Sequence, residues 1–231
     1  MIQKSVGTRT FKIILIFIIV ITGIFLFNKN KTMPKIPDKF KVFQFDKVFE
    51  PSNLKNEILI GVIADTHIPT RVRKIPEQVK KIFKNVDLII HAGDIETLEV
   101  LEELEEIAPV YAIVGNWESA QVKRSLPTGI ALEIFDFRIG VVHSPNPFWL
   151  GSHFNTVQEY IAPGLAQKHN FDILVFGHTH RSFLKKVNVG EKNILLFNPG
   201  SPTTPFLSQA SVGLLRLTED SFKGEIIYLE I

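Results

Sequence analysis

Five segments of this chain place side chains that can bind divalent metal ions directly after a run of apolar residues. In the clearest, Ile58 to His67, the apolar run stops at Asp65 and His67. Short apolar runs rich in β-branched residues predict buried strands, and α/β proteins bind ligands at the carboxyl ends of such strands. The candidate metal ligands at the ends of the five segments are Asp65, His67, Asp94, Asn116, His143, His178 and His180.

These residues offer only nitrogen and oxygen ligands, and the chain has no cysteine. Such ligands suit manganese, our first expectation, and also iron, nickel, magnesium or zinc. Asp65 and His67 are two residues apart, as are His178 and His180, and residues with that spacing on a strand point the same way. Because one ion cannot use so many ligands, we expect two adjacent divalent ions with Asp94 as a bridging carboxylate. Two such ions activate a shared water and hold a phosphoryl group, which is the chemistry of phosphoester hydrolysis.

Alternating strand and helix signals are expected to position these side chains. From Ile58 to Val114 the pattern is strand, helix, strand, helix, strand, which predicts parallel strands. Thr156 to His169 is predicted to be helical, with a kink or break at Pro163, and the remainder is rich in predicted strands. The composition, 45% hydrophobic and 22% charged, is that of a globular protein, and the net charge of +2 does not favour nucleic acid as a partner.

The N-terminal segment has a different character. Residues 1–32 are predicted to be a tail with a transmembrane anchor, whose apolar part, 11–27, is near the lower limit of length for a spanning helix. Residues 33–57 are predicted to be a linker, in which Phe40 to Phe45 could add an edge strand. The excess of lysines after the apolar segment favours a single-pass, membrane-anchored protein with a cytoplasmic domain. If translation starts at Met33 instead, the protein is expected to be cytoplasmic and soluble.

The order of the motifs is also informative. They are Asp65-Thr66-His67, Gly93-Asp94, Gly115-Asn116, His143, Gly177-His178-Thr179-His180 and Asn198-Pro199-Gly200-Ser201. In this combination the chain resembles the calcineurin-like metallophosphoesterases, specifically their small phosphodiesterase branch in bacteria and archaea. The resemblance covers residues 58–231 and implies an α/β fold, a four-layer αββα sandwich of two mixed β-sheets flanked by helices. It also implies a dinuclear metal-dependent enzyme that hydrolyses phosphodiesters through a metal-bridging hydroxide.

The resemblance further implies how the ligands divide between the two ions. One ion would be held by Asp65, His67, Asp94 and His180. The other would be held by Asp94, Asn116, His143 and His178. The catalytic residues would then be Asn116, His143 and Asp94.

Two positions depart from the family pattern. Many members have a histidine after Gly-Asn that serves as general acid, and here that residue is Trp117. We therefore expect weak action on monoesters and better action on diesters with good leaving groups. The branch commonly has His-Gly-His where this chain has His143-Ser144-Pro145, a change that bears on substrate contact more than on metal binding. The candidate substrate-binding residues are Asn116, Arg71 and His153.

A non-catalytic role is the alternative. The same fold serves as the small subunit of the retromer sorting complex. The segment His67-Ile68-Pro69 of this chain also resembles that subunit. In this alternative the chain is a scaffold with little or no catalysis, and its surface binds protein partners. The complete ligand set, including Asp94, favours the enzyme. The sequence does not determine whether the chain forms a homo-oligomer or which phosphodiester is its substrate.

Overall fold

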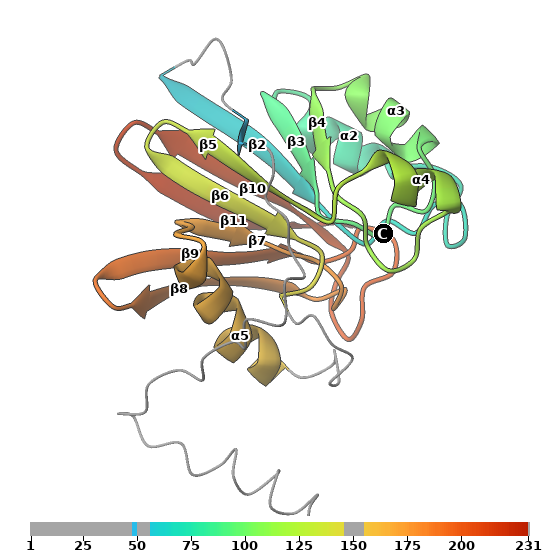
Figure 1. The fold of residues 1–231 in the computed structure, drawn as a ribbon. Helices are drawn as coiled ribbons and strands as arrows, with labels where there is room; N and C mark the ends of the chain where they lie inside the picture. The colour runs from blue at the N-terminus through green and yellow to red at the C-terminus, as the bar shows by residue number, and fades with distance from the viewer. Residues whose placement is uncertain (1–47, 50–55, 146–154, 231) are drawn as a thin grey trace, which may run out of the picture. The chain divides into compact units, whose positions relative to one another are not determined.

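The computed structural model describes residues 48–49, 56–145 and 155–230 (Figure 1). The predicted anchor at 11–27, the candidate strand at Phe40 to Phe45 and the candidate substrate contact His153 lie outside these residues. In the part of the chain that is described, no helix is long and apolar enough to cross a membrane.

One sheet carries the parallel strands that the sequence predicts. Its strand order is β11-β10-β2-β3-β4, with β2, β3 and β4 parallel and β10 and β11 antiparallel (Figure 1). The connections between the parallel strands contain helices α2 and α3. The bounds are β2 Glu57–Ile63, α2 Glu77–Phe83, β3 Leu88–His91, α3 Glu99–Glu105, β4 Val110–Ala112, β10 Ser211–Thr218 and β11 Phe222–Tyr228.

The second sheet has the order β1-β5-β6-β7-β9-β8 and is also mixed. Strands β6, β7 and β9 are parallel, whereas β5 and β8 run antiparallel to their neighbours β6 and β9. Strand β1, inside the predicted linker, pairs in parallel with β5. The bounds are β1 Val48–Phe49, α4 Ala120–Ser125, β5 Gly129–Ile134, β6 Phe137–Val142, α5 Asn155–Lys168, β7 Ile173–Val175, β8 Ser182–Val189 and β9 Lys192–Pro199.

Buried apolar clusters hold these elements together. Alternate residues of a strand face opposite sides of the sheet, so Ile60 and Val62 of β2 enter the cluster shared by the two sheets, which also contains Phe197. Ile63 faces the other side and packs in a cluster with Phe83 of α2. Because β2 is buried on both faces, its sequence is continuously apolar rather than alternating.

The predicted α/β class is confirmed, with two mixed sheets and few helices. Of the kink or break expected at Pro163, the break is wrong, because α5 continues from Asn155 to Lys168. Ala162 and Leu165, on either side of the proline, are buried in a cluster with strand residues of the second sheet. This packing offsets the hydrogen bond that proline cannot make.

Candidate metal centre

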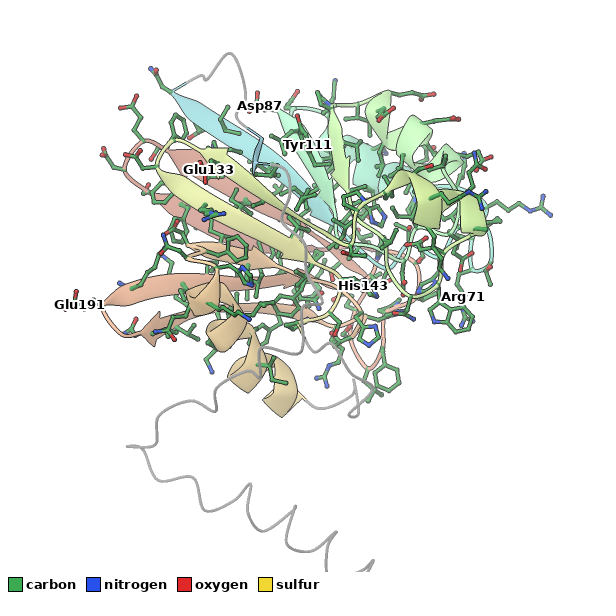
Figure 2. All side chains as sticks on the ribbon, viewed as in Figure 1. Arg71, Asp87, Tyr111, Glu133, His143 and Glu191 are labelled. Carbon is green, nitrogen blue, oxygen red and sulfur yellow. The ribbon has the colours of Figure 1, made fainter. Side chains whose placement is uncertain are left out.

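The predicted ligands lie in loops that follow the carboxyl ends of strands from both sheets. His143 and Arg71 lie at this end, whereas Glu133 and Glu191 lie at the other end of the strands (Figure 2). The ligand atoms form two overlapping groups, in each of which all the atoms lie within 4.8 Å of one another. One group is Asp65, His67, Asp94 and His180, and the other is Asp94, His143 and His178.

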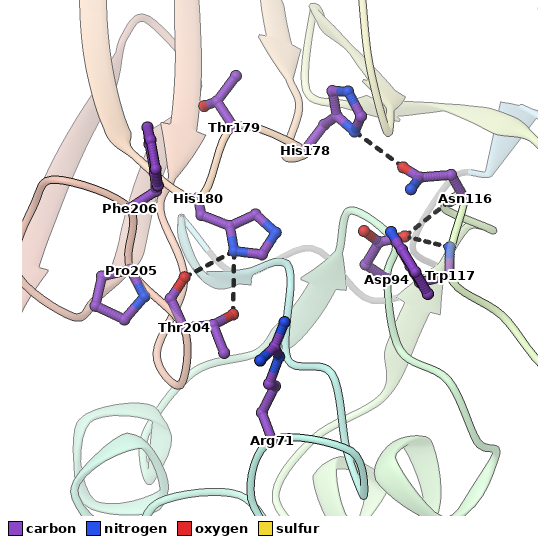
Figure 3. Close-up of a pocket in the computed structure, with 10 residues that line it drawn as sticks. All are labelled: Arg71, Asp94, Asn116, Trp117, His178, Thr179, His180, Thr204, Pro205 and Phe206. Atoms are coloured by element: carbon purple, nitrogen blue, oxygen red, sulfur yellow. Dashed lines mark hydrogen bonds between the residues drawn. The ribbon is translucent and has the colours of Figure 1, made fainter. Parts of the chain in front are cut away.

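Asn116 joins the second group. Its side-chain Oδ1 lies 2.9 Å from His143 Nε2. It also lies 2.9 Å from His178 Nδ1 (Figure 3). The structure therefore brings together all seven residues that the sequence proposes as ligands. Arg71 borders the same space, while His153 lies outside the described residues.

The carboxylate of Asp94 is divided between two tasks. Its Oδ1 accepts hydrogen bonds from the backbone N–H groups of Asn116 and Trp117, at 2.7 and 2.9 Å. Its Oδ2 lies 3.3 Å from His67 Nε2 and 3.4 Å from His143 Nε2. Because each histidine belongs to a different group, Oδ2 is the atom that both groups share.

The backbone at the site adopts an uncommon conformation. Five candidate ligands have positive φ angles between 46° and 73°, namely Asp65, His67, Asp94, His178 and His180. Non-glycine residues rarely occupy this left-handed region. Strand β2 ends at Ile63, so Asp65 and His67 are not on a strand, and the predicted reason for their convergence is wrong. They converge because Asp65 and His67, on either side of Thr66, each turn the loop through the left-handed region, which redirects each side chain separately.

Residues 58–220 match the calcineurin-like phosphoesterase superfamily domain. The chain belongs to this superfamily. A Methanothermobacter thermautotrophicus protein named "Probable metallophosphoesterase" is 38% identical over 170 residues, which cover 74% of this chain and 92% of that protein. A Methanocaldococcus jannaschii protein named as a phosphodiesterase is 26% identical over 182 residues, covering 73% of this chain and 98% of the relative. The solved structure of vacuolar protein sorting 29 from Cryptosporidium parvum has the same fold, with a TM-score of 0.57 and 21% identity, and covers 77% of this chain and 100% of its own.

The side chains of this phosphoesterase domain fit divalent ions. Ring nitrogens lie close together in pairs: His67 Nε2 is 3.2 Å from His180 Nε2, and His143 Nε2 is 3.3 Å from His178 Nδ1. Asp65 Oδ2 is buried and has no hydrogen-bond partner among the described residues. A cation between these atoms would satisfy all of them, because neutral imidazole and carboxylate are metal ligands.

Three of the histidines are oriented through their second ring nitrogen. His67 Nδ1 donates to Glu96 Oε1 at 3.0 Å, and His143 Nδ1 donates to the carbonyl oxygen of Ala92 at 2.8 Å. His180 Nδ1 donates to the Thr204 carbonyl oxygen at 2.7 Å. Each bond fixes the tautomer and directs Nε2 into the site, as partners of metal-binding histidines do. The sequence did not lead us to predict Glu96 as a partner of His67, although its position two residues after the candidate ligand Asp94 could have suggested it.

The charges of the site are strongly coupled. Burial opposes ionisation of Asp94, but hydrogen bonds from His143 and His67 outweigh it and hold the pKa of this carboxyl well below its usual range. Burial likewise opposes protonation of His143, yet its contact with Asp94 raises the pKa of the imidazole to about 9. Burial raises the pKa of Asp65. The cluster therefore favours an anionic Asp94 surrounded by positive charge, whether from protons or from metal ions.

The loops are tied to one another by residues that do not face the ions. Glu118 accepts from the backbone N–H of Ile95, Glu96 and Gly115, so one carboxylate connects the loop after β3 to the loop after β4. The Ser201 hydroxyl donates to the carbonyl oxygen of Asp65 at 2.7 Å. These contacts link segments far apart in the sequence, which is why no local pattern revealed them.

A pocket of about 420 Å³ opens beside the ligands (Figure 3). Besides metal-binding candidates, it is bordered by one cationic side chain, Arg71, and by the aromatic rings of Trp117 and Phe206. The full lining is Arg71, Asp94, Asn116, Trp117, His178, Thr179, His180, Thr204, Pro205 and Phe206. Its volume is enough for a small phosphate ester.

Proposed function

We propose that the chain is a dinuclear metal-dependent phosphodiesterase. The observation that carries the proposal is Asp94 Oδ2, which faces a histidine of each ligand group at 3.3 and 3.4 Å. A carboxylate oxygen shared in this way is the expected bridge of a two-metal hydrolase. Asp65, His67, Asp94 and His180 would hold one ion, and Asp94, Asn116, His143 and His178 the other. Together the sheets and helices would form the four-layer αββα sandwich of the family.

Two divalent ions, with manganese as our first choice, would supply an activated water and offset negative charge on the phosphoryl oxygens. The chain's own residues orient the reaction. Glu96 and the carbonyl oxygens of Ala92 and Thr204 hold the histidine rings so that their Nε2 atoms face inward. The amide of Asn116 and the guanidinium of Arg71 border the pocket, where they can bind phosphoryl oxygens.

Trp117 determines which esters the site can cleave. It stands where a general acid would protonate the leaving group, and an indole cannot supply a proton. The leaving group must therefore depart as a stable anion, so the site should cleave esters with acidic leaving groups, and among these we propose diesters rather than monoesters. The relative named as a phosphodiesterase supports this preference.

Hydrolysis of bis(p-nitrophenyl) phosphate with Mn²⁺ tests the proposal, with p-nitrophenyl phosphate as the monoester comparison. Loss of a supporting residue around a metal typically costs about 10- to 100-fold, so Asp94→Asn and His178→Ala should each lose at least about 100-fold. Glu191→Ala, an exposed acid at the other end of the strands, should match wild type. If Asp94→Asn matches it as well, the proposal is wrong.

A scaffold is the second candidate. It is favoured by the structural similarity to vacuolar protein sorting 29, which covers the whole of that protein's chain. At 21% identity, this similarity shows a shared fold alone. The shared Asp94 favours the enzyme, since a scaffold has no need of it. If pull-down from cells recovers stoichiometric protein partners, or a homo-oligomer forms, and no metal supports turnover, the scaffold would be preferred.

The N-terminal division remains a proposal. We propose residues 1–32 as a tail with a single-pass anchor, 33–57 as a linker and 58–231 as the catalytic domain, on the cytoplasmic side of the membrane. The support is the apolar segment 11–27 and the lysines that follow it. Detergent, but not high salt, should release the full-length protein from membranes. Release by salt alone, or a mature protein that begins at Met33, would contradict the anchor.

A further inference from the structure

Three side chains around the pocket do not belong to the ligand set, yet the backbone of each is bonded to a ligand. The N–H of Trp117 donates to Asp94 Oδ1 at 2.9 Å. The N–H of Phe206 donates to the His180 carbonyl oxygen at 3.1 Å, and the N–H of Arg71 donates to the His67 carbonyl oxygen at 2.8 Å. The positions of these side chains are therefore fixed relative to the candidate metal ions.

The aromatic rings are exposed beside a strongly polar site. Trp117 is 65% exposed and Phe206 is 42% exposed. The backbone N–H of Trp117 would bond to Asp94 whichever side chain the residue carried, apart from proline, so building the metal site does not require the indole. Ligand pockets are typically lined by apolar and aromatic side chains together with a few polar groups. The indole is therefore available for a ligand rather than for the core.

The rings and the charges lie around one space. Figure 3 shows Trp117 beside Asp94 and Asn116, Phe206 beside His180, and Arg71 extending between these two groups. A phosphate ester bound at the ligand cluster would place its phosphoryl oxygens within reach of a cation and its organic substituent toward one of the two rings, which lie on opposite sides of the space. Flat aromatic groups gain most from such a ring, because they can stack on it in an offset arrangement.

We infer that Trp117, together with Phe206, forms a stacking subsite for a flat aromatic substituent on the phosphate, such as an aryl ring or a nucleobase. The inference rests on the proposed function and specifies its substrate class: diesters that carry an aromatic group. Arg71 contributes by pairing with the phosphoryl oxygens. Trp117 is the specificity-determining residue, because it is the more exposed of the two rings and adjoins Asn116.

Two inhibitors that differ only in their substituent test the subsite. Phenylphosphonate and methylphosphonate carry the same charged group, and each has a single substituent, so the ring can occupy only one place. Their dissociation constants are measured by calorimetry on the Mn²⁺-loaded full-length protein. Stacking of this kind is worth about 5- to 100-fold in affinity. Wild type should therefore bind phenylphosphonate at least about fivefold more tightly than methylphosphonate.

The variants separate stacking from general damage. Trp117→Ala should bring the ratio of the two dissociation constants close to one, and Trp117→Phe should keep most of the preference. Leu207→Ala is the matched control, because Leu207 is 80% exposed and adjoins Phe206 but does not line the pocket. It should leave the ratio unchanged.

Fluorescence gives a second readout that does not depend on turnover. The chain has two tryptophans, so Trp149→Phe leaves Trp117 as the sole tryptophan, and excitation at a wavelength that tyrosine does not absorb isolates its emission. Phenylphosphonate should quench its emission more than methylphosphonate does at equal occupancy. Equal quenching, or a Trp117→Ala variant that keeps the wild-type ratio, overturns the subsite and assigns the indole to another contact, such as one with a protein. If wild type binds neither phosphonate and hydrolyses no diester, the proposed function itself fails.

Discussion

Removing the carboxylate of Glu118 should loosen two ligand loops at once. Its Oε1 accepts from Ile95 N at 3.0 Å and from Gly115 N at 2.8 Å. Its Oε2 accepts from Glu96 N at 2.6 Å and from Ile95 N at 3.2 Å. Three backbone N–H groups therefore depend on one side chain, and Glu118→Ala leaves all three without their acceptor.

The size of the effect follows from these contacts. A hydrogen bond to a charged group contributes about 1.5–3 kcal/mol, but Glu118 is only partly buried, so water can replace some of the lost bonds. We expect Glu118→Ala to lower the free energy of unfolding by about 3 kcal/mol. Glu118→Gln keeps one acceptor oxygen but turns an NH₂ group toward a backbone N–H, so its loss should be about 1–2 kcal/mol.

Urea unfolding of the EDTA-treated protein measures this loss, and calorimetry with Mn²⁺ measures the effect on the site. Because the Glu118 bonds hold the loops of Asp94 and Asn116, metal affinity should fall by about 10- to 100-fold. Glu105→Ala removes the same charge from the exposed face of α3 and should change stability by less than about 0.5 kcal/mol. If Glu118→Ala is as stable as Glu105→Ala, the two loops are not joined through this carboxylate.

Three other predictions concern the same site. Gly115→Ala should abolish tight metal binding in calorimetry, because the added Cβ would lie 2.1 Å from Asp94 Oδ1 and 2.3 Å from Asp94 N. If the variant binds metal with wild-type affinity, the loop can move aside. Since Asp94 raises the pKa of His143 to about 9, an ion must displace a proton at pH 7. Metal binding should therefore release protons, measured by calorimetry in buffers of different ionisation enthalpy, and affinity should rise from pH 7 to 9; a pH-independent affinity would contradict this reasoning. Glu96→Gln should weaken metal binding by about 10- to 100-fold, because the negative charge that pairs with His67 is lost, and an unchanged affinity would show that the ring does not need a charged partner.

The sequence predicted where the site would lie better than how it is built. The apolar run from Ile58 identified a buried strand, and its polar end identified Asp65 and His67 as candidates, because burial and strand polarity leave a periodic signal. We predicted that these two residues converge because they lie on a strand, but β2 ends at Ile63, before either of them. A left-handed φ at a histidine has no local signature, and it is imposed by tertiary contacts such as the bond from Ser201 to the Asp65 carbonyl oxygen.

Glu118 illustrates a different limit. The acid was visible in the sequence after Trp117, but two of the three N–H groups that it accepts from, those of Ile95 and Glu96, lie more than 20 residues earlier. Contacts of that range depend on the whole fold and not on neighbouring residue types. The expected break at Pro163 failed for a related reason, because packing of α5 on the second sheet outweighs the local preference of proline.

The left-handed backbone at five candidate ligands has a cost in stability. A non-glycine residue in this region costs about 1–2 kcal/mol relative to glycine, so the five positions together store strain comparable to the net stability of a small domain. Exchanging His180 for glycine or asparagine would relieve part of that strain and make the fold more robust while the metal ligand was lost. A lineage that used the fold only as a scaffold would gain stability from such exchanges. Under the proposed function, the chain keeps the metal site at the expense of that stability.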